Sequence, residues 1–366
     1  MGLSERIAEI QAEMARTQRN KATESHLCRL KARLAQLRSE LIESNAKSSA
    51  GGKGSGFAVE KTGDVRVALL GFPSVGKSSL LNLLTETKSE VSEQDFCTLT
   101  CIPGNLIYND VHIQLLDLPG IIEGAASGRG RGKEVLSVIR SADLCLMMVE
   151  SDKAELQVDL LTKEVEAMGI RLNQQPPDIT VRQTKTGGIK LTQGVPLTRI
   201  TQKDVVSVLH SYKIMNAEVL FREDLGVDSL IDVVAKNRIY MPCIYTFNKV
   251  DNIVIEETNR LASKPYWVPI SCAYNLNLDR LLLSLWKALS IVRVYTKKKG
   301  CPPDFTEPIV LRKGGTVKNL CRYIHSTMEE RFKYAIVYGA SAKHKGQRVG
   351  LAHQLCDEDV VSIFAR

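Results

Sequence analysis

The chain has 366 residues, of which 44% are hydrophobic and 25% are charged. This composition is typical of soluble globular proteins and provides material for two or three compact modules. The formal net charge of +8 is uneven: residues 1–53 carry +4, residues 291–366 carry +7 and the remainder carries −3. A polyanionic partner is therefore expected to meet the ends of the chain, although a solvated basic face would have the same composition.

The sequence argues against a secreted or membrane-bound protein. Its nine cysteines are odd in number and scattered, without paired CxxC spacing, which is typical of a reducing compartment without structural zinc. No apolar run approaches the length of a membrane span, and the first residues lack the apolar core of a signal peptide. We expect a cytoplasmic protein without membrane contact.

Residues 1–47 are predicted to form a helical hairpin, because apolar residues recur there at spacings of three and four. They are Ile7, Ile10 and Met14, then Leu27, Leu30, Leu34, Leu37 and Leu41. The narrow apolar seam either closes on itself or a neighbouring domain, or receives a helix of a partner, and the sequence leaves both open. Residues 48–63 begin rich in Gly and Ser and are predicted to be a linker.

From residue 64 onward, short apolar runs alternate with helical segments. The runs are 65–70, 111–116, 144–149, 243–247 and 267–270. Each is typical of a buried parallel strand, and their alternation with helices predicts an α/β fold with a doubly wound sheet. We assign residues 64–152 and 239–291 to this domain.

Residues 153–238 interrupt that alternation. They contain Pro176-Pro177, the turn-like Gly187-Gly188 and an alternating segment at 179–181. This pattern predicts a small inserted α+β subdomain.

The composition and the pattern of apolar residues change again over residues 292–366. This segment contains Lys297-Lys298-Lys299, a Pro302-Pro303 turn and strand-like runs at 309–311 and 334–338. A separate, basic, β-rich domain is predicted there.

The segment Gly71-Phe72-Pro73-Ser74-Val75-Gly76-Lys77-Ser78 follows the first strand and precedes a helical stretch that starts with Ser79. This is the strand, loop and helix context that the pattern GxxxxGK(S/T) requires. Its glycines allow backbone N–H groups to face phosphates, and the helix N-terminus adds a favourable dipole. Residues 71–79 are the expected phosphate site, with Lys77 on the β- and γ-phosphates and Ser78 on Mg²⁺.

A second element, Asp117-Leu118-Pro119-Gly120, stands at the end of the strand 111–116. A carboxylate there can hold Mg²⁺ through water, and Gly120 is expected to donate its N–H to the γ-phosphate. The DxxG pattern alone is weak, because turns of this composition are common. Its position after the phosphate loop gives it weight.

The third element, Asn248-Lys249-Val250-Asp251, selects the base. Asp251 can accept hydrogen bonds from the guanine N1–H and amino group, which adenine lacks. Asn248 is expected to brace the phosphate loop, and the stem of Lys249 to cover the base. Ser271-Cys272-Ala273, after the strand 267–270, is expected to offer a backbone N–H to the guanine oxygen. The three elements in this order predict a GTP-binding P-loop fold and disfavour an ATPase.

With these motifs the chain resembles the developmentally regulated GTP-binding proteins, the DRG subfamily of the Obg-related GTPases, and within it the second eukaryotic branch. The resemblance covers nearly the whole chain and includes the segments 52–54, 115–126, 216–224 and 303–306. It implies an N-terminal helical region, a GTPase domain interrupted by a small inserted domain, and a C-terminal TGS domain of β-grasp fold.

The resemblance also implies association with ribosomes and with a DRG family regulatory protein that stabilises the GTPase. We therefore expect a translation-linked switch that hydrolyses GTP to GDP and contacts the ribosome or its RNA through the C-terminal domain. The alternative is an RNA- or protein-binding scaffold that holds GTP with little turnover.

Switch I of the family matches residues 94–99 of this chain. Thr98 stands at the second threonine of the family pattern, so the implied Mg²⁺ and γ-phosphate role is carried to Thr98. Cys97 replaces the first threonine and supplies no comparable hard oxygen. The expected Mg²⁺ ligands are Ser78, Thr98 and Asp117, and the expected catalytic residues are Lys77, Thr98 and Gly120.

Ile121 stands where many GTPases place the glutamine that orients the attacking water. Because its side chain forms no hydrogen bond, unassisted hydrolysis is expected at or below the ~10⁻⁴ s⁻¹ scale of small GTPases. Potassium is a second candidate cation. Related potassium-using loops often carry Asn or Asp at the place of Ser74, which keeps an oxygen there.

Overall fold

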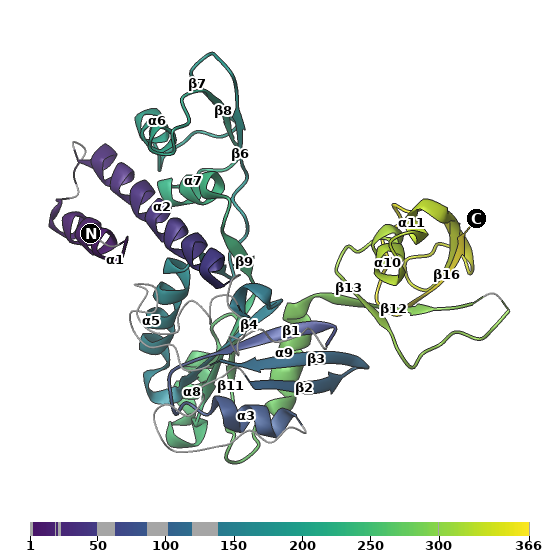
Figure 1. Ribbon diagram of the computed structural model, residues 1–366. Helices are drawn as coiled ribbons and strands as arrows, with labels where there is room; N and C mark the ends of the chain where they lie inside the picture. The colour runs from purple at the N-terminus through teal and green to yellow at the C-terminus, as the bar shows by residue number, and fades with distance from the viewer. Residues whose placement is uncertain are drawn as a thin grey trace. The chain divides into compact units, whose positions relative to one another are not determined.

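The computed structural model describes residues 3–18, 20, 23–49, 63–85, 102–118, 138–298 and 300–365. These residues fall into two compact units, and Figure 1 labels their helices and strands. The first unit draws on Met1–Ala58, Ile121–Arg140 and Val158–Met241, and the second on Val59–Gly120, Ser141–Gln157 and Pro242–Arg366. No helix of the described part of the chain is long and apolar enough to cross a lipid bilayer.

A six-stranded sheet with the order β11-β10-β4-β1-β3-β2 lies at the centre of the second unit. Its strands are β1 (Val65–Leu70), β2 (Ile102–Tyr108), β3 (Val111–Asp117), β4 (Leu144–Glu150), β10 (Cys243–Asn248) and β11 (Trp267–Pro269). All neighbours are parallel except β2 and β3. The five strands predicted from apolar runs are therefore confirmed as parallel. The sequence analysis did not predict β2, whose Pro103 and Gly104 are tolerated because this strand lies at the sheet edge.

Helices cover this sheet, as the unbroken burial of β1 requires. The helices that belong to the GTPase fold are α3 (Lys77–Leu84), α8 (Ile255–Ala262) and α9 (Leu278–Leu289), and α5 (Ala154–Ala167) follows β4. Alternate residues of β1 share one core with Leu80 and Leu81 of α3 and Leu281 and Leu285 of α9. Two short 3₁₀ turns, Ser151–Lys153 and Val250–Asn252, lie just beyond the carboxyl ends of β4 and β10.

The C-terminal segment forms a five-stranded sheet with the order β13-β12-β16-β14-β15. Its elements are β12 (Ile291–Thr296), β13 (Ile309–Arg312), α10 (Val317–Ile324), α11 (Met328–Arg331), β14 (Phe332–Tyr338), β15 (Gln347–Val349) and β16 (Asp359–Ala365). β12 and β16 are parallel and the other pairs are antiparallel. Leu320 of α10 shares a core with Val294, Val337 and Val361 of the sheet. This is the β-grasp arrangement expected of a TGS domain.

In the first unit, α1 (Leu3–Arg16) and α2 (Glu24–Ser49) form the predicted hairpin. Ile7 and Ile10 of α1 pack against Leu30 and Leu37 of α2, so the apolar seam closes on itself. A second face of α2, made of small residues, packs against the inserted subdomain. α2 continues through Ser49, two residues into the segment predicted to be a linker.

The inserted subdomain has the predicted α+β character. It contains β5 (Ile170–Leu172), β6 (Ile179–Gln183), β7 (Ile189–Gln193), α6 (Gln202–Ser211), β8 (Ala217–Phe221), α7 (Val227–Ala235) and β9 (Ile239–Met241). The sheet order is β6-β8-β7, and β5 pairs separately with β9. Because β9 pairs with β5, the chain leaves this region a few residues later than the expected boundary after residue 238.

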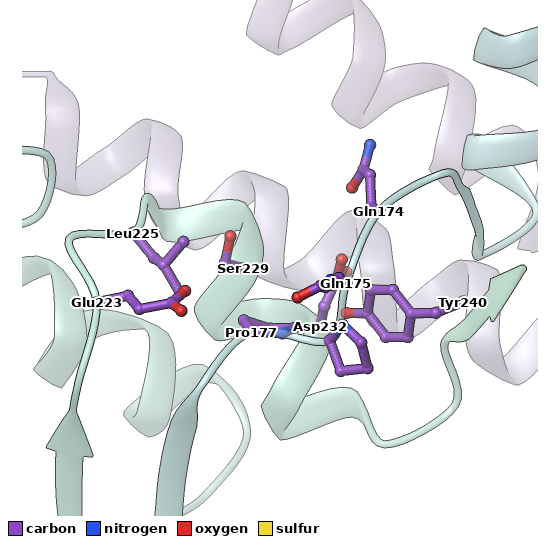
Figure 2. A pocket seen from close by; sticks show the side chains of 9 residues that line it. Gln174, Gln175, Pro177, Glu223, Leu225, Ser229, Asp232 and Tyr240 are labelled. Carbon is purple, nitrogen blue, oxygen red and sulfur yellow. The ribbon is translucent and has the colours of Figure 1, made fainter. Parts of the chain in front are cut away.

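The carboxylate of Asp232 joins α7 to the strands that flank the subdomain. It accepts hydrogen bonds from Arg171 Nε at 2.7 Å and from Arg238 Nε at 2.8 Å, and the side chains of Asp232 and Arg238 are only 6% and 7% exposed. Asp232 also lines a hollow of about 160 Å³ together with Gln175 and Tyr240 (Figure 2). The carboxylate is thus a buried connection between three elements.

We expect Asp232→Ala to lower the free energy of unfolding by about 3–5 kcal/mol, since it leaves buried guanidinium groups without a counter-charge. Asp178→Ala is a matched control, because it removes an exposed 2.8 Å ion pair with Arg222 and should cost at most about 1 kcal/mol. Urea unfolding followed by circular dichroism compares the two variants. Equal losses would contradict a structural role for the buried carboxylate.

Candidate nucleotide-binding site

The phosphate loop of the sequence analysis joins β1 to α3. Gly76 has a φ of 101°, and a Cβ at this position would lie 2.5 Å from Asn248 Nδ2. A Cβ at Gly71 would lie 2.3 Å from the carbonyl oxygen of Met148. Both positions therefore require glycine, which lets the loop pack directly against the ends of β4 and β10.

Lys77 is buried in this loop with 6% of its surface exposed. Its Nζ donates hydrogen bonds to the carbonyl oxygens of Gly71 at 3.2 Å and Phe72 at 2.9 Å. Burial lowers the pKa of Lys77, and the nearby charge of Asp117 acts in the opposite direction. The ammonium thus rests on neutral carbonyls, and a phosphate oxygen would be a stronger, charged acceptor.

Ser78 and Asp117 meet at the base of the loop. Ser78 Oγ donates to Asp117 Oδ2 at 2.7 Å, and Asp117 Oδ1 is buried without a hydrogen-bond partner in the described part of the chain. Burial raises the pKa of Asp117, opposed by the Ser78 hydrogen bond and the charge of Lys77. An unsatisfied carboxylate oxygen beside a hydroxyl fits Mg²⁺, which keeps most of its waters and takes few protein ligands.

Asn248 links the phosphate loop to the segments that the sequence predicts to bind the base. The residue is 4% exposed. Its Nδ2 donates to the carbonyl oxygen of Val75 at 2.8 Å, and its Oδ1 accepts from the backbone N–H of Cys272 at 3.0 Å. One buried amide therefore fixes the positions of three segments that lie far apart in the sequence.

Asp251 lies on the 3₁₀ turn that follows β10 and is exposed, so its carboxylate is open to a ligand. Its Oδ1 accepts a 2.6 Å hydrogen bond from Ser271 Oγ. Lys249 has a φ of 63° and forms an ion pair with Glu150 at the end of β4. The carboxylate and the lysine side chain are thus each held by a contact from a neighbouring strand end.

The structure assigns positions to most residues of the predicted site. Lys77, Ser78, Asp117, Asn248 and Cys272 are connected by the contacts above, and Ser79 and Ala273 lie next to them in the chain. Thr98, Gly120 and Ile121, with the rest of switch I and the start of switch II, lie outside the described residues, so their roles stay predictions.

Two supporting residues were missed by the sequence analysis. Glu150 pairs with Lys249, and Ser151 Oγ donates to the carbonyl oxygen of Lys249 at 2.9 Å. Both directly follow a predicted parallel strand, and polar side chains at the carboxyl end of such a strand are the signal that could have found them.

We expect Asp117→Asn to stabilise the protein without nucleotide and to remove its Mg²⁺-dependent binding of GTP. Burial disfavours the ionised carboxylate of Asp117 at neutral pH, and a neutral amide avoids that cost. A gain of about 1 kcal/mol would raise the melting temperature by about 2–4 °C.

The pH dependence of this effect has a defined sign. Because the pKa of Asp117 is raised in the folded protein, the folded chain takes up the proton before the unfolded chain does as pH falls. The advantage of Asp117→Asn should therefore shrink on acidification. Thermal melts across pH, with GTP titrations in Mg²⁺ and in EDTA, test both parts. A lower melting temperature at neutral pH, or Mg²⁺ dependence that persists, would contradict them.

Comparison with known proteins agrees with this geometry. Residues 66–183 match a family described as 50S ribosome-binding GTPase, residues 186–291 match the C-terminal region of the MMR_HSR1 domain, and residues 292–365 match the TGS domain. The structure and these matches together show a P-loop GTPase domain followed by a TGS domain.

Relatives that match along the whole of this chain are found in several eukaryotes. The chain is 54% identical over 366 residues to Developmentally-regulated GTP-binding protein 2 of Homo sapiens, with 100% of both chains covered. It is 55% identical to Developmentally-regulated G-protein 2 of Arabidopsis thaliana, with 100% of this chain and 92% of that one covered. The homologue of Dictyostelium discoideum is 52% identical, again over 100% of both chains. With these motifs, this site and this extent of similarity, the chain belongs to the family of developmentally-regulated GTP-binding proteins.

Proposed function

We propose that this GTP-binding protein hydrolyses GTP slowly to GDP and phosphate and uses the cycle as a switch on the ribosome. The observation that carries the proposal is the set of contacts made by Asn248. They tie the phosphate loop to the segment after β11, where Ser271 holds the Asp251 carboxylate that selects guanine. A base site and a phosphate site joined by one buried amide suit a nucleotide that bridges both.

The residues of the site have separate tasks in this proposal. The Lys77 ammonium leaves the carbonyls of Gly71 and Phe72 and binds the β- and γ-phosphates. Ser78 and Asp117 would hold Mg²⁺, which neutralises charge on the phosphates when bound. Thr98 and Gly120 complete the γ-phosphate site.

Slow turnover follows from Ile121, which leaves the attacking water without a side chain to orient it. A partner or a cation must then complete the site, and we propose the ribosome in this role, with K⁺ as a second cation. A DRG family regulatory protein is proposed to stabilise the GTPase.

Two facts support a ribosomal partner. The GTPase domain matches a family described as ribosome-binding, and residues 291–366 have a net charge of +7. A positively charged domain that contacts RNA phosphates displaces counterions. The logarithm of its affinity therefore falls by about 0.7–0.9 for each phosphate contact when the salt concentration rises tenfold.

Co-sedimentation with ribosomes across a salt series tests this proposal. Charge reversal of Lys297, Lys298 and Lys299 to Glu should weaken pelleting and flatten its salt dependence. Reversal of Lys185 and Lys190, which are exposed lysines of the inserted subdomain, is the control and should change neither. Binding that is unaffected by the first set would contradict docking through the C-terminal domain.

A further inference from the structure

The sheet of the TGS domain has two different faces. Val337 of β14 and Val361 of β16 point into the core that α10 covers. Their neighbours point to the opposite side, because side chains alternate along a strand. This second face carries Tyr334 and Tyr338 of β14 and Phe364 of β16, together with Arg348 of β15 and Lys297 after β12. We call these five residues the aromatic–cation face.

Cations lie over the aromatic rings of this face. The rings of Tyr334 and Phe364 are stacked, with centroids 4.6 Å apart and an interplanar angle of 16°. The Arg348 guanidinium lies 4.0 Å from the centroid of the Tyr334 ring. Because β14 lies between β15 and β16, the Tyr334 ring is placed between the arginine and the phenylalanine. The three side chains form one continuous stack.

Tyr338 forms a second platform on the same face. The residue is 38% exposed, and Lys297 Nζ lies 5.4 Å from the centroid of its ring. The chain turns close beside the ring, since a Cβ at Gly346 would lie 3.2 Å from Tyr338 Cε1. The loop that ends at this glycine carries the exposed basic run Lys343-His344-Lys345. The platform is therefore flanked by positive charge on two sides.

The strands β14, β15 and β16 add no exposed carboxylate to this face. Asp359 is the one acidic residue in the sequences of β14, β15 and β16, and it is buried. Asp357 and Glu358, which precede it, are paired with Arg293. Aromatic rings and cations on strands that add no exposed carboxylate complement a polyanion that carries flat rings.

We propose that the aromatic–cation face binds single-stranded RNA, with one base on Tyr338, another on the exposed Arg348 guanidinium at the end of the stack, and phosphates beside the lysines. Unpaired bases stack on aromatic rings and on guanidinium planes, whereas duplex RNA offers mainly its backbone and 2′-hydroxyls. Tyrosine, phenylalanine and arginine are also enriched in the cores of protein interfaces, whereas lysine is depleted there, so the test below includes a protein partner as one outcome. This inference rests on the proposed ribosomal function and names the surface and the form of RNA involved.

The test uses the full-length protein and fluorescence anisotropy with an oligouridylate of about 12 nucleotides, within the site sizes of stacking proteins. Tyr338→Leu should weaken binding about fivefold or more, the lower end of base stacking, whereas Tyr338→Phe keeps the ring and should retain near wild-type affinity. Tyr323→Leu is the matched control, because Tyr323 is 58% exposed on α10, which covers the other face. It should leave binding unchanged.

The salt dependence separates the two kinds of contact. Tyr338→Leu removes no phosphate contact and should keep the wild-type slope, whereas Lys297→Gln should reduce it by about 0.7. A duplex of the same length should bind more weakly than the single strand. Wild-type affinity of Tyr338→Leu for oligouridylate, or equal affinity of the wild-type protein for the duplex, would overturn the proposal.

Two further measurements keep the outcomes distinct. Crosslinking of the wild-type protein to a 4-thiouridine oligonucleotide needs no substitution. Crosslinks at the aromatic–cation face would support the proposal. Crosslinks confined to other domains would refute it. Ribosome-stimulated GTP hydrolysis is measured alongside. If Tyr338→Leu loses ribosomes but keeps oligouridylate, the face docks a protein instead. If the wild-type protein shows no stimulation, the proposed function fails whatever the oligonucleotide does.

Discussion

Asp251→Asn is expected to move the preference of the protein from guanine to xanthine nucleotides. The carboxylate would accept two hydrogen bonds from guanine, and each charge-assisted hydrogen bond contributes about 1.5–3 kcal/mol. GTP affinity should therefore fall by about 10²- to 10⁴-fold. XTP should gain affinity, because xanthine presents a carbonyl oxygen where guanine presents its amino group.

The structure explains how the side-chain amide of the Asp251→Asn variant is expected to be oriented. Ser271 Oγ donates to Asp251 Oδ1 at 2.6 Å, and the amide oxygen of the variant can keep this hydrogen bond. The NH₂ group is then left to face the base, as xanthine requires. Adding Ser271→Ala to Asp251→Asn should reduce the gain for XTP.

Competition calorimetry with GTP, GDP and XTP measures these affinities. Unchanged GTP affinity together with no gain for XTP would remove Asp251 from the base site. A loss of all nucleotide binding with an unchanged melting temperature would show that Asp251 supports the site without selecting the base.

Lys77→Ala is expected to lower the turnover rate about 10²- to 10³-fold. This is the loss seen when a hydrogen-bond donor that stabilises the charge developing in the transition state is removed. The buried ammonium is now held by two backbone carbonyls, so a variant without it leaves those carbonyls free and the phosphates without their cation. GTP and GDP affinity should fall together, because the lysine is expected to reach the β-phosphate as well.

Stability measurements separate this effect from misfolding. Burial lowers the pKa of Lys77, so the charged form is disfavoured in the fold and its removal should not lower the melting temperature without nucleotide. The wild-type protein should gain about 2.7 kcal/mol of stability at a nucleotide concentration of 100 times Kd, and Lys77→Ala should lose this gain. Ser78→Ala should bind GTP as the wild-type protein does in EDTA and bind it more weakly than the wild type in Mg²⁺. Normal turnover in both variants would defeat the phosphate-loop assignment.

Much of the fold could be predicted because its signals are local. β4 is an almost continuous apolar run, as a strand buried on both faces requires, and β1, β3, β10 and β11 are mostly apolar with a few polar residues such as Arg66 and Gln114. The edge strand β2 lacks such a run and was missed. The second buried face of α2 was missed for another reason: it consists of Cys28, Ala32 and Ala35, and small residues give a weak periodic signal although they allow close packing.

Some contacts of the site could likewise be predicted from local motifs, and others could not. The motif order predicted a bracing role for Asn248, and the structure contains such a contact with Val75. The hydrogen bond from the Ser271 side chain to Asp251 and the ion pair of Lys249 with Glu150 join residues about 20 and 100 positions apart. Such pairings depend on strand order in the sheet, which no single segment encodes.

Single-turnover hydrolysis of GTP, measured with and without ribosomes in potassium and in sodium buffers, tests the proposed switch most directly. The protein alone should hydrolyse GTP at or below about 10⁻⁴ s⁻¹. Ribosomes should raise this rate at least about tenfold and at most by the ~10⁵-fold that GTPase activators reach. Lys77→Ala should abolish the accelerated rate. Tight GTP binding with no hydrolysis above background under any of these conditions would contradict the switch and identify a scaffold that holds GTP.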